Sequence, residues 1–197
     1  MNYSIYAEST PNPGVMKFVA NRMLVDKSIE ITQAEQAKDI SVAKALFNFP
    51  FVKSLYLSSN FISIAKTDNV EWDMIAMQLR NFITDFLNEE GLKNYTENIS
   101  EEDIIKTEVK VEKNTEKIEF TDKENAIIDL LNEYIKPAVE ADGGAITFNS
   151  YVGDVVTVNL KGACSGCPSS TSTLKGGIES LLNQKVDPNI VVRANEG

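Results

Sequence analysis

The sequence predicts an α+β protein of two small α/β-sandwich-type domains joined by a charged flexible linker. Apolar residues alternate in some stretches and recur at steps of three and four in others, which predicts strands and helices mixed along the chain. The length of 197 residues suits two domains of ordinary size. A stretch of alternating charge with few aromatic residues separates them, so we expect domains at 1–90 and 122–197 and a linker at 91–121.

The first domain is expected to mix strands with two helices. Ser41 is placed to cap the amino end of the first helix. Two apolar runs joined by residues 58–60 predict a β-hairpin, and apolar residues at steps of three and four predict an amphipathic second helix. In chain order we expect an edge strand at 3–7, a turn with two prolines at 8–14, strands at 15–19, 51–57 and 61–65, and helices at 41–49 and 72–87.

The second domain is expected to begin with a capping box, in which Thr121 and Glu124 satisfy each other's backbone amides. Pro137 should end or kink the helix that follows, because proline lacks an amide hydrogen. Two period-2 runs around residues 152–154 predict a second hairpin. We further expect a turn at 142–144, a helix that starts near residues 169–172 and is broken at 186–188, and a short closing strand at 190–192.

Composition narrows the possible functions. A formal net charge of −10 argues against a nucleic-acid groove, because neutralising phosphates needs clustered lysine and arginine. The chain has no histidine, which excludes Ser–His and Cys–His nucleophile pairs and histidine-ligated zinc or haem. No apolar stretch is long enough to span a bilayer, and the first residues resemble neither a signal nor a transit peptide. We therefore expect no membrane partner and a cytoplasmic location.

The chemistry concentrates in one loop, residues 162–170, which holds the only two cysteines, Cys164 and Cys167. Seven of the ten glycines lie between residues 143 and 177, so backbone freedom is concentrated around the two thiols. In a reducing compartment, a Cys-x-x-Cys pair more often binds a metal or reacts than forms a structural bridge. Three uses of the pair are open: dithiol–disulfide exchange, structural zinc and an iron–sulfur cluster.

Dithiol–disulfide exchange suits two thiols before a helix, because the helix dipole would lower a thiol pKa. A thioredoxin-like fold needs further strands and a helix after this motif, however, and only thirty residues follow Cys167. Zinc and an iron–sulfur cluster each need about four ligands, and one chain offers two thiolates. Either site would have to be shared by two chains, and a cluster would lie at a two-fold interface near solvent. Such a site suits a protein that passes its cluster on.

Several motifs resemble those of Nfu-type proteins. The run Gly-Ala-Cys-Ser-Gly-Cys-Pro-Ser-Ser at 162–170, together with residues 173–178 and 135–144, resembles the NifU C-terminal domain. The turn Thr-Pro-Asn-Pro at 10–13, with Lys-Phe at 17–18, is similar to the Nfu N-terminal domain. The two resemblances together cover everything except the linker.

The resemblance implies an iron–sulfur cluster carrier or scaffold rather than an enzyme. It would bind one 4Fe–4S cluster per homodimer through Cys164 and Cys167, receive it from an upstream cluster-assembly scaffold and pass it to apo iron–sulfur proteins by thiolate exchange. A dithiol–disulfide oxidoreductase that uses the same two cysteines is the alternative. Ala145 stands where the family often has an acidic residue, which affects only a local turn contact. For residues 10–13 we expect a packed turn, with a contact to target proteins as the alternative.

Overall fold

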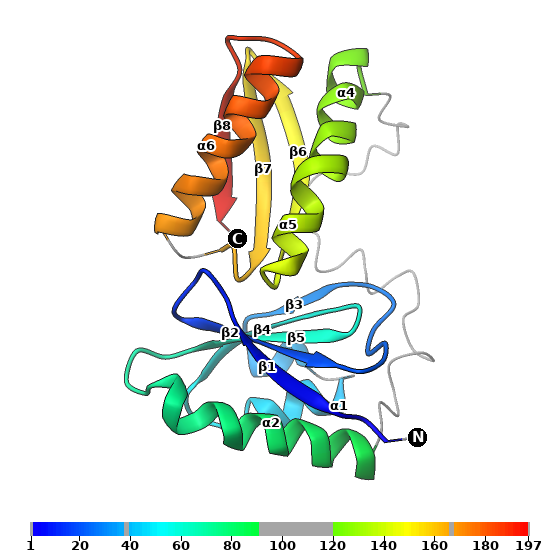
Figure 1. Ribbon diagram of the computed structural model, residues 1–197, viewed down its shortest axis with the longest axis vertical. Helices are drawn as coiled ribbons and strands as arrows, with labels where there is room; N and C mark the ends of the chain where they lie inside the picture. The colour runs from blue at the N-terminus through cyan, green and yellow to red at the C-terminus, as the bar shows by residue number, and fades with distance from the viewer. Residues whose placement is uncertain (1, 38–39, 91–119, 166–167, 197) are drawn as a thin grey trace.

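The computed structural model describes residues 2–37, 40–90, 120–165 and 168–196, which form two domains, each with its own sheet and hydrophobic core (Figure 1). The predicted fold class, α+β with two domains, is confirmed. Most of the predicted linker at 91–121 lies outside the described residues, as does the predicted ligand Cys167.

The first domain is a five-stranded antiparallel sheet with helices on one face (Figure 1). Its strands follow the spatial order β1-β2-β5-β4-β3. Buried side chains of the central strands, among them Phe18, Ile62 and Ile64, form one core with the helices. The elements are β1 (Ile5–Ser9), β2 (Val15–Ala20), β3 (Ile29–Ile31), the 3-10 helix η1 (Ala34–Ala37), α1 (Ser41–Leu46), β4 (Val52–Ser58), β5 (Phe61–Lys66) and α2 (Trp72–Glu89).

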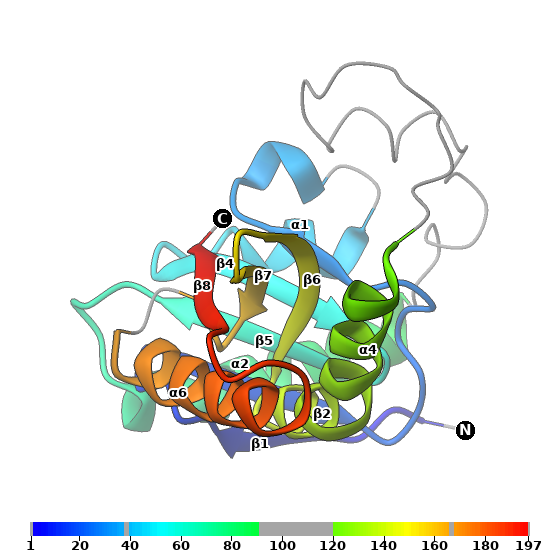
Figure 2. The same ribbon diagram turned by 90° about the horizontal axis from the view of Figure 1, so that it is seen from above.

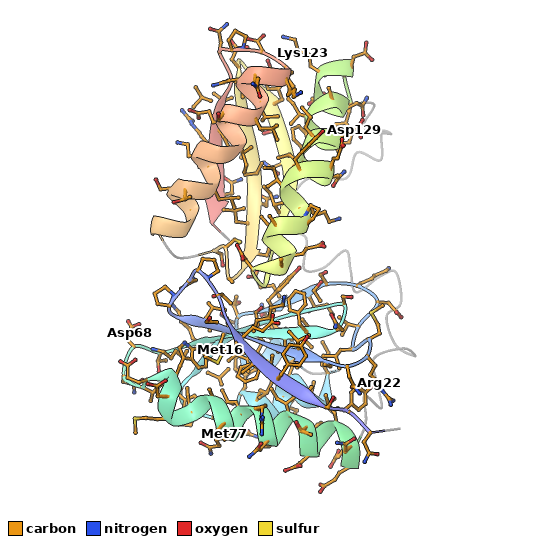
Figure 3. All side chains as sticks on the ribbon, in the orientation of Figure 1. Met16, Arg22, Asp68, Met77, Lys123 and Asp129 are labelled. Atoms are coloured by element: carbon orange, nitrogen blue, oxygen red, sulfur yellow. The ribbon has the colours of Figure 1, made fainter. Side chains whose placement is uncertain are left out.

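Helix α2 lies where the apolar periodicity predicts it. Ile75, Leu79, Ile83 and Leu87 recur at steps of four, and all four are buried in the first core. Burying each such side chain contributes about 1.5–3 kcal/mol, so this stripe holds the helix on the sheet. Met77 points to the opposite side, away from the sheet and the second domain (Figure 3).

The structure corrects three local predictions in the first domain. Ser41 is the first residue of α1, and the N-cap is Ile40, which makes no side-chain hydrogen bond. Ile40 is buried in the first core, so packing rather than a capping hydroxyl sets where this helix begins. The first strand starts at Ile5, two residues later than expected. The strand β3 was not predicted, because three residues carry too little pattern to be recognised.

The second domain opens with a long helical stretch in three parts. Thr121 caps it and forms the expected capping box with Glu124. Pro137 does not end the helix, which continues to Ala141. A π-helical turn lies directly before the proline and accommodates its missing amide hydrogen, so the irregularity falls where a kink was expected. The parts are α4 (Asp122–Leu130), the π-helical turn η2 (Leu131–Ile135) and α5 (Lys136–Ala141).

Three strands and a last helix complete the second domain. The predicted hairpin is present, and its tip residues Gly153 and Asp154 both have positive φ, +56° and +63°, as a type I′ turn requires. The last strand runs parallel to its neighbour and is longer than predicted. All the helices of this domain lie on one face of its sheet (Figure 2). The elements are β6 (Gly144–Val152), β7 (Val155–Gly162), α6 (Pro168–Lys185) and β8 (Val191–Glu196).

Candidate metal centre at the domain boundary

The cysteine loop lies at the end of the second domain that faces the first (Figure 1). It follows β7 and leads into α6. Cys164 is only 7% exposed and packs with the core of the second domain. The sequence led us to expect a site near solvent, and for Cys164 the structure differs because the thiol packs into the core of its own domain.

Gly144 makes room for the Cys164 thiol. A Cβ atom at Gly144 would lie 2.7 Å from Cys164 Sγ and 2.8 Å from the carbonyl oxygen of Lys161. Real side chains do not approach their neighbours so closely, so glycine alone lets the start of β6 pass this near to the thiol. The glycine concentration around the cysteines thus has a steric cause at this position.

The surroundings of Cys164 favour its neutral thiol. Burial, assisted by the negative charge of Asp142, raises the pKa of the Cys164 thiol to about 11. We expected the helix dipole to lower a thiol pKa, and for Cys164 the shift is the opposite because apolar side chains surround it. At neutral pH Cys164 is therefore protonated, and a metal ion would supply the positive charge that its thiolate lacks here.

A cleft of about 360 Å³ opens beside Cys164 at the boundary between the domains. Pro11 lines it from the first domain, and the other lining residues belong to the second domain. They are Ala138, Val139, Asp142, Ala163, Cys164, Thr173 and Leu174. A ligand that enters this cleft meets Cys164 and the first domain together.

The polar groups near Cys164 are engaged with the loop's own backbone. Ser165 Oγ donates to the carbonyl oxygen of Gly162 at 3.0 Å, and Thr171 Oγ1 donates to the carbonyl oxygen of Cys164 at 3.4 Å. Both hydroxyls, which could otherwise donate to a thiolate or sulfide, therefore stabilise the loop in this structure. The side chains of Ser169 and Ser170 lie outside the described residues.

Asn12 joins the first domain to the cysteine loop. Its side chain is largely buried, and Nδ2 donates to the carbonyl oxygens of Ala163 at 3.2 Å and Ser165 at 3.3 Å. These two carbonyl groups flank Cys164 in the sequence. The turn at 10–13 is therefore packed, as expected, and its contact is the cysteine loop of the same chain.

The amide group of Asn12 is also held within its own turn. Oδ1 accepts a hydrogen bond from the backbone N–H of Gly14 at 2.9 Å, and the backbone N–H of Asn12 donates to Thr10 Oγ1 at 3.2 Å. Thr10 Oγ1 donates in turn to the carbonyl oxygen of Val15 at 2.9 Å. The turn therefore orients Asn12 independently of the second domain.

Five residues in one row across the first sheet face the second domain. Glu8 pairs with Lys17, and Lys17 pairs with Ser63. Ser63 pairs with Tyr56, and Tyr56 pairs with Glu30. The row therefore crosses all five strands, on the face opposite to the helices, and we call these five residues the cross-strand row. The second domain stands on this face (Figures 1 and 2).

Members of the cross-strand row contact Gly143 and Gly162, which lie at the two ends of the second domain's hairpin. Ser63 Oγ donates to the carbonyl oxygen of Gly143 at 2.6 Å, and the N–H of Gly162 donates to Glu30 Oε1 at 3.1 Å. A Cβ atom at Gly143 would lie 2.7 Å from Ser63 Oγ, and one at Gly162 would lie 2.8 Å from Tyr56 Cδ1. Both glycines have positive φ, so the close approach and the backbone shape each favour glycine.

Lys17 caps the end of α5 across the domain boundary. Its Nζ donates to the carbonyl oxygen of Ala141 at 2.8 Å and lies 3.4 Å from that of Glu140. A cation at the carboxyl end of a helix is favourable because it meets the negative end of the helix dipole. The same ammonium group lies 3.5 Å from Glu8 Oε2 and 4.7 Å from the centre of the Phe61 ring. The carbonyl oxygens, the carboxylate and the aromatic ring therefore stabilise the charge of Lys17, although its side chain is buried.

Cys164 and Cys167 stay predicted ligands, and the sequence analysis missed Asn12 and the cross-strand row. The available signal is an interruption of apolar runs by polar residues, such as Lys17 beside Phe18 and Ser63 beside Ile62. That pattern predicts an open sheet face. It does not say that another domain covers the face, because the contact joins residues more than a hundred positions apart.

The described part of the chain contains no group of three or more cysteine, aspartate or glutamate side chains placed to hold a metal ion. Within the same ranges, no helix combines the length and apolar character needed to cross a membrane.

Two family models match the chain, one for each domain. "Scaffold protein Nfu/NifU N terminal" matches residues 5–90, and "NifU-like domain" matches residues 127–193. The second match contains both cysteines.

Curated relatives align along most of the chain. A Drosophila grimshawi protein named "NFU1 iron-sulfur cluster scaffold homolog, mitochondrial" is 34% identical over 181 residues, covering 90% of this chain and 57% of the relative. Its namesake from Drosophila persimilis is 33% identical over 181 residues, covering 90% and 60%. The chain therefore spans less than two thirds of the length of these relatives. Their names state a mitochondrial location and contradict the cytoplasmic one, which we had expected from the first residues and from the lack of a long apolar stretch.

A solved structure is similar to one part of the chain. The solution NMR structure of a NifU-like protein from Saccharomyces cerevisiae aligns at 26% identity with a TM-score of 0.43, and it covers 49% of this chain and 87% of that protein. Since both family models match in the predicted order and together cover most of the sequence, this chain belongs to the Nfu/NifU family of iron–sulfur scaffold proteins.

Proposed function

We propose that this chain carries a 4Fe–4S cluster between two copies of itself, through Cys164 and Cys167 of each copy, and transfers it to apo-proteins. Family membership supports a scaffold or carrier role. The observation that carries the proposal is the thiol count. The chain has two cysteines, both in the loop that matches the NifU-like domain, and a cluster takes about four thiolates. Two copies of the chain supply that number.

The cluster is cargo in this proposal, and the chain acts without catalysis. Each thiol loses its proton as its sulfur binds iron, so loading releases protons. On delivery, a target thiolate binds iron as a carrier thiolate leaves, so one Fe–S bond forms as another breaks and no electron is transferred. An upstream cluster-assembly scaffold and apo iron–sulfur proteins are the proposed partners.

The protonated state of Cys164 favours the carrier over the dithiol–disulfide oxidoreductase. Disulfide exchange needs a thiolate as the attacking group, and a thiol pKa of about 11 leaves little thiolate near neutral pH. Iron supplies its own positive charge and so stabilises the thiolate as the bond forms. A buried neutral thiol is also less prone to oxidation while no cluster is bound.

The proposal divides the chain as the sequence does. Residues 122–197 would provide both cluster ligands, residues 1–90 would form the separate first domain, and residues 91–121 would connect them. Each domain has its own buried core, which supports this division.

Anaerobic loading with iron and sulfide tests the proposal. The wild-type chain should bind about one cluster per two chains and sediment as a dimer when loaded. Cys164→Ser and Cys167→Ser should each abolish loading, and circular dichroism checks that each variant remains folded. Cys164 packs in the second core, so its replacement by the smaller, more polar serine should lower the stability of the second domain without unfolding it. Ser180→Ala, at an exposed position of α6, is the control and should load normally.

Two outcomes would contradict the proposal. One is a full cluster on a strict monomer or on either cysteine variant. The other is efficient reduction of insulin disulfides by the apo-protein, which would indicate the oxidoreductase instead.

A further inference from the structure

We propose that the first domain is a releasable cap on the cysteine loop, held by Asn12 and the cross-strand row, and that the capped loop is closed to the loop of a second chain. The claim that the cap excludes a second chain rests on the proposed function, in which two cysteine loops share one cluster. The claim that the first domain is a releasable cap concerns the chain without any cluster.

The cap contacts the loop where a partner would have to approach. Asn12 binds the carbonyl groups on both sides of Cys164, and Pro11 forms one wall of the cleft beside the thiol. Four thiolates around one cluster require two such loops to face each other at close range. In the described arrangement the first domain occupies that side of the loop, so it must move before two chains can share a cluster.

The contact between the domains is suited to release. Each hydrogen bond described above from the first domain meets a backbone atom of the second, and water can replace such bonds when the domains separate. The apolar contribution is small: Ala145 packs against a cluster of Val19, Tyr56 and Phe61. Polar contacts of this kind between domains commonly permit relative motion. Because each domain has its own core, release does not unfold either one.

Asn12→Asp is the variant that tests the cap. The substitution keeps the shape of the side chain, and Oδ1 can still accept from the N–H of Gly14. The second carboxylate oxygen then faces the carbonyl oxygens of Ala163 and Ser165, so two hydrogen bonds become repulsive contacts. Asn81→Asp adds the same charge at an exposed position of α2, one turn after Met77, and is the matched control.

Amide hydrogen exchange of the cluster-free full chain provides the first readout. In Asn12→Asp, amides at 162–165 should exchange about tenfold faster than in wild type, as expected for the loss of two ordinary hydrogen bonds. The radius of gyration from small-angle scattering should increase as the domains separate. Asn81→Asp should match wild type in both measurements. The fluorescence of Trp72, the single tryptophan, reports whether the first domain remains folded.

Ser63→Ala is a second variant that leaves the Asn12 turn intact. It removes the hydrogen bond to the Gly143 carbonyl, so it should raise exchange at the same amides in the same direction. Unchanged exchange and scattering in both Asn12→Asp and Ser63→Ala, with the first domain folded, would overturn the cap.

Cluster loading provides the second readout. If the cap excludes a second chain, Asn12→Asp should load and dimerise faster than wild type by about the same factor as its exchange rate increases. Equal loading rates for the two chains would overturn the exclusion. If neither chain takes up a cluster, the proposed carrier function is wrong. Exchange and scattering of the cluster-free chain still test whether the first domain is a releasable cap.

Discussion

At the scale of single residues, the fold keeps the thiol of Cys164 in its neutral, protonated form. Its thiol lies among apolar side chains, and the Asp142 carboxylate nearby opposes ionisation as well. Both effects act on the charged form, so they raise the pKa. The reactivity of this thiol should therefore respond to pH over a different range from that of an ordinary cysteine.

In a Cys167→Ser chain, which leaves Cys164 as the only thiol, alkylation by iodoacetamide reports this pKa. The rate should keep rising with pH and level off only near the thiol pKa of about 11. The ordinary cysteine pKa is about 8.5, and a free cysteine should level off there. The midpoint of the rate profile, measured between pH 7 and 11.5, checks the prediction.

Asp142→Asn serves as the companion variant for the same measurement. Removing the carboxylate charge should move the midpoint to lower pH, because a neutral neighbour no longer opposes the thiolate. In the Cys167→Ser chain that keeps Asp142, a midpoint near the ordinary cysteine value would show that Cys164 is not buried in solution.

At the scale of secondary-structure elements, two glycines of the second domain predict opposite effects of the same substitution. Gly144→Ala places a Cβ atom 2.7 Å from Cys164 Sγ and 2.8 Å from the Lys161 carbonyl oxygen, so β6 must shift at a cost of about 1–3 kcal/mol. Gly176 lies in the interior of α6 with open space around it. Gly176→Ala should stabilise the fold by about 0.5–1 kcal/mol, because alanine loses less backbone entropy in a helix.

Calorimetry of the full chain measures both substitutions. The unfolding temperature of the second domain should fall for Gly144→Ala and rise for Gly176→Ala, with the transition of the first domain almost unchanged. If both variants behaved alike, the close packing described around Cys164 would be wrong.

Long, strongly patterned elements are the ones that could be predicted from the sequence. The position of helix α2 and the capping box of α4 are as expected, because each depends on residues within a few positions of one another. Predictions failed where a distant contact decides the outcome. Ile40 starts α1 through burial in the core, and β3 exists because it pairs with β4. Neither contact leaves a local signal.

At the scale of the whole molecule, the two domains are coupled through side chains of the first and the backbone of the second. Lys17 belongs to β2, but it caps α5 in the other domain. A change at Lys17 should therefore affect the stability of a domain to which it does not belong.

Lys17→Met should lower the unfolding temperature of the second domain. The substitution removes a cation from the last carbonyl groups of α5, an interaction of about 1–2 kcal/mol in a partly buried setting. Lys53→Met, at an exposed position of β4, is the control and should change neither transition. A Lys17→Met effect confined to the first domain would contradict the coupling.

The candidate site could be predicted only in part for the same reason. The proposed ligands Cys164 and Cys167 are the chain's only thiols, so counting is sufficient to select them as candidates. Asn12 and the cross-strand row act across the domain boundary, and their alignment depends on the register of all five strands. That register is a product of the folded sheet, and no local sequence pattern encodes it.

The side chains of the first domain bind backbone atoms of the cysteine loop, and this has an evolutionary consequence for the loop. A carbonyl group is present whatever residue occupies a position, and an amide hydrogen is present in every residue except proline, so substitutions on the outward side chains of the cysteine loop leave these bonds in place. Within this contact, the constrained positions are the glycines that permit the close approach. In the proposed carrier, selection for new recipient proteins can therefore alter the loop's side chains without compensating mutations in the first domain.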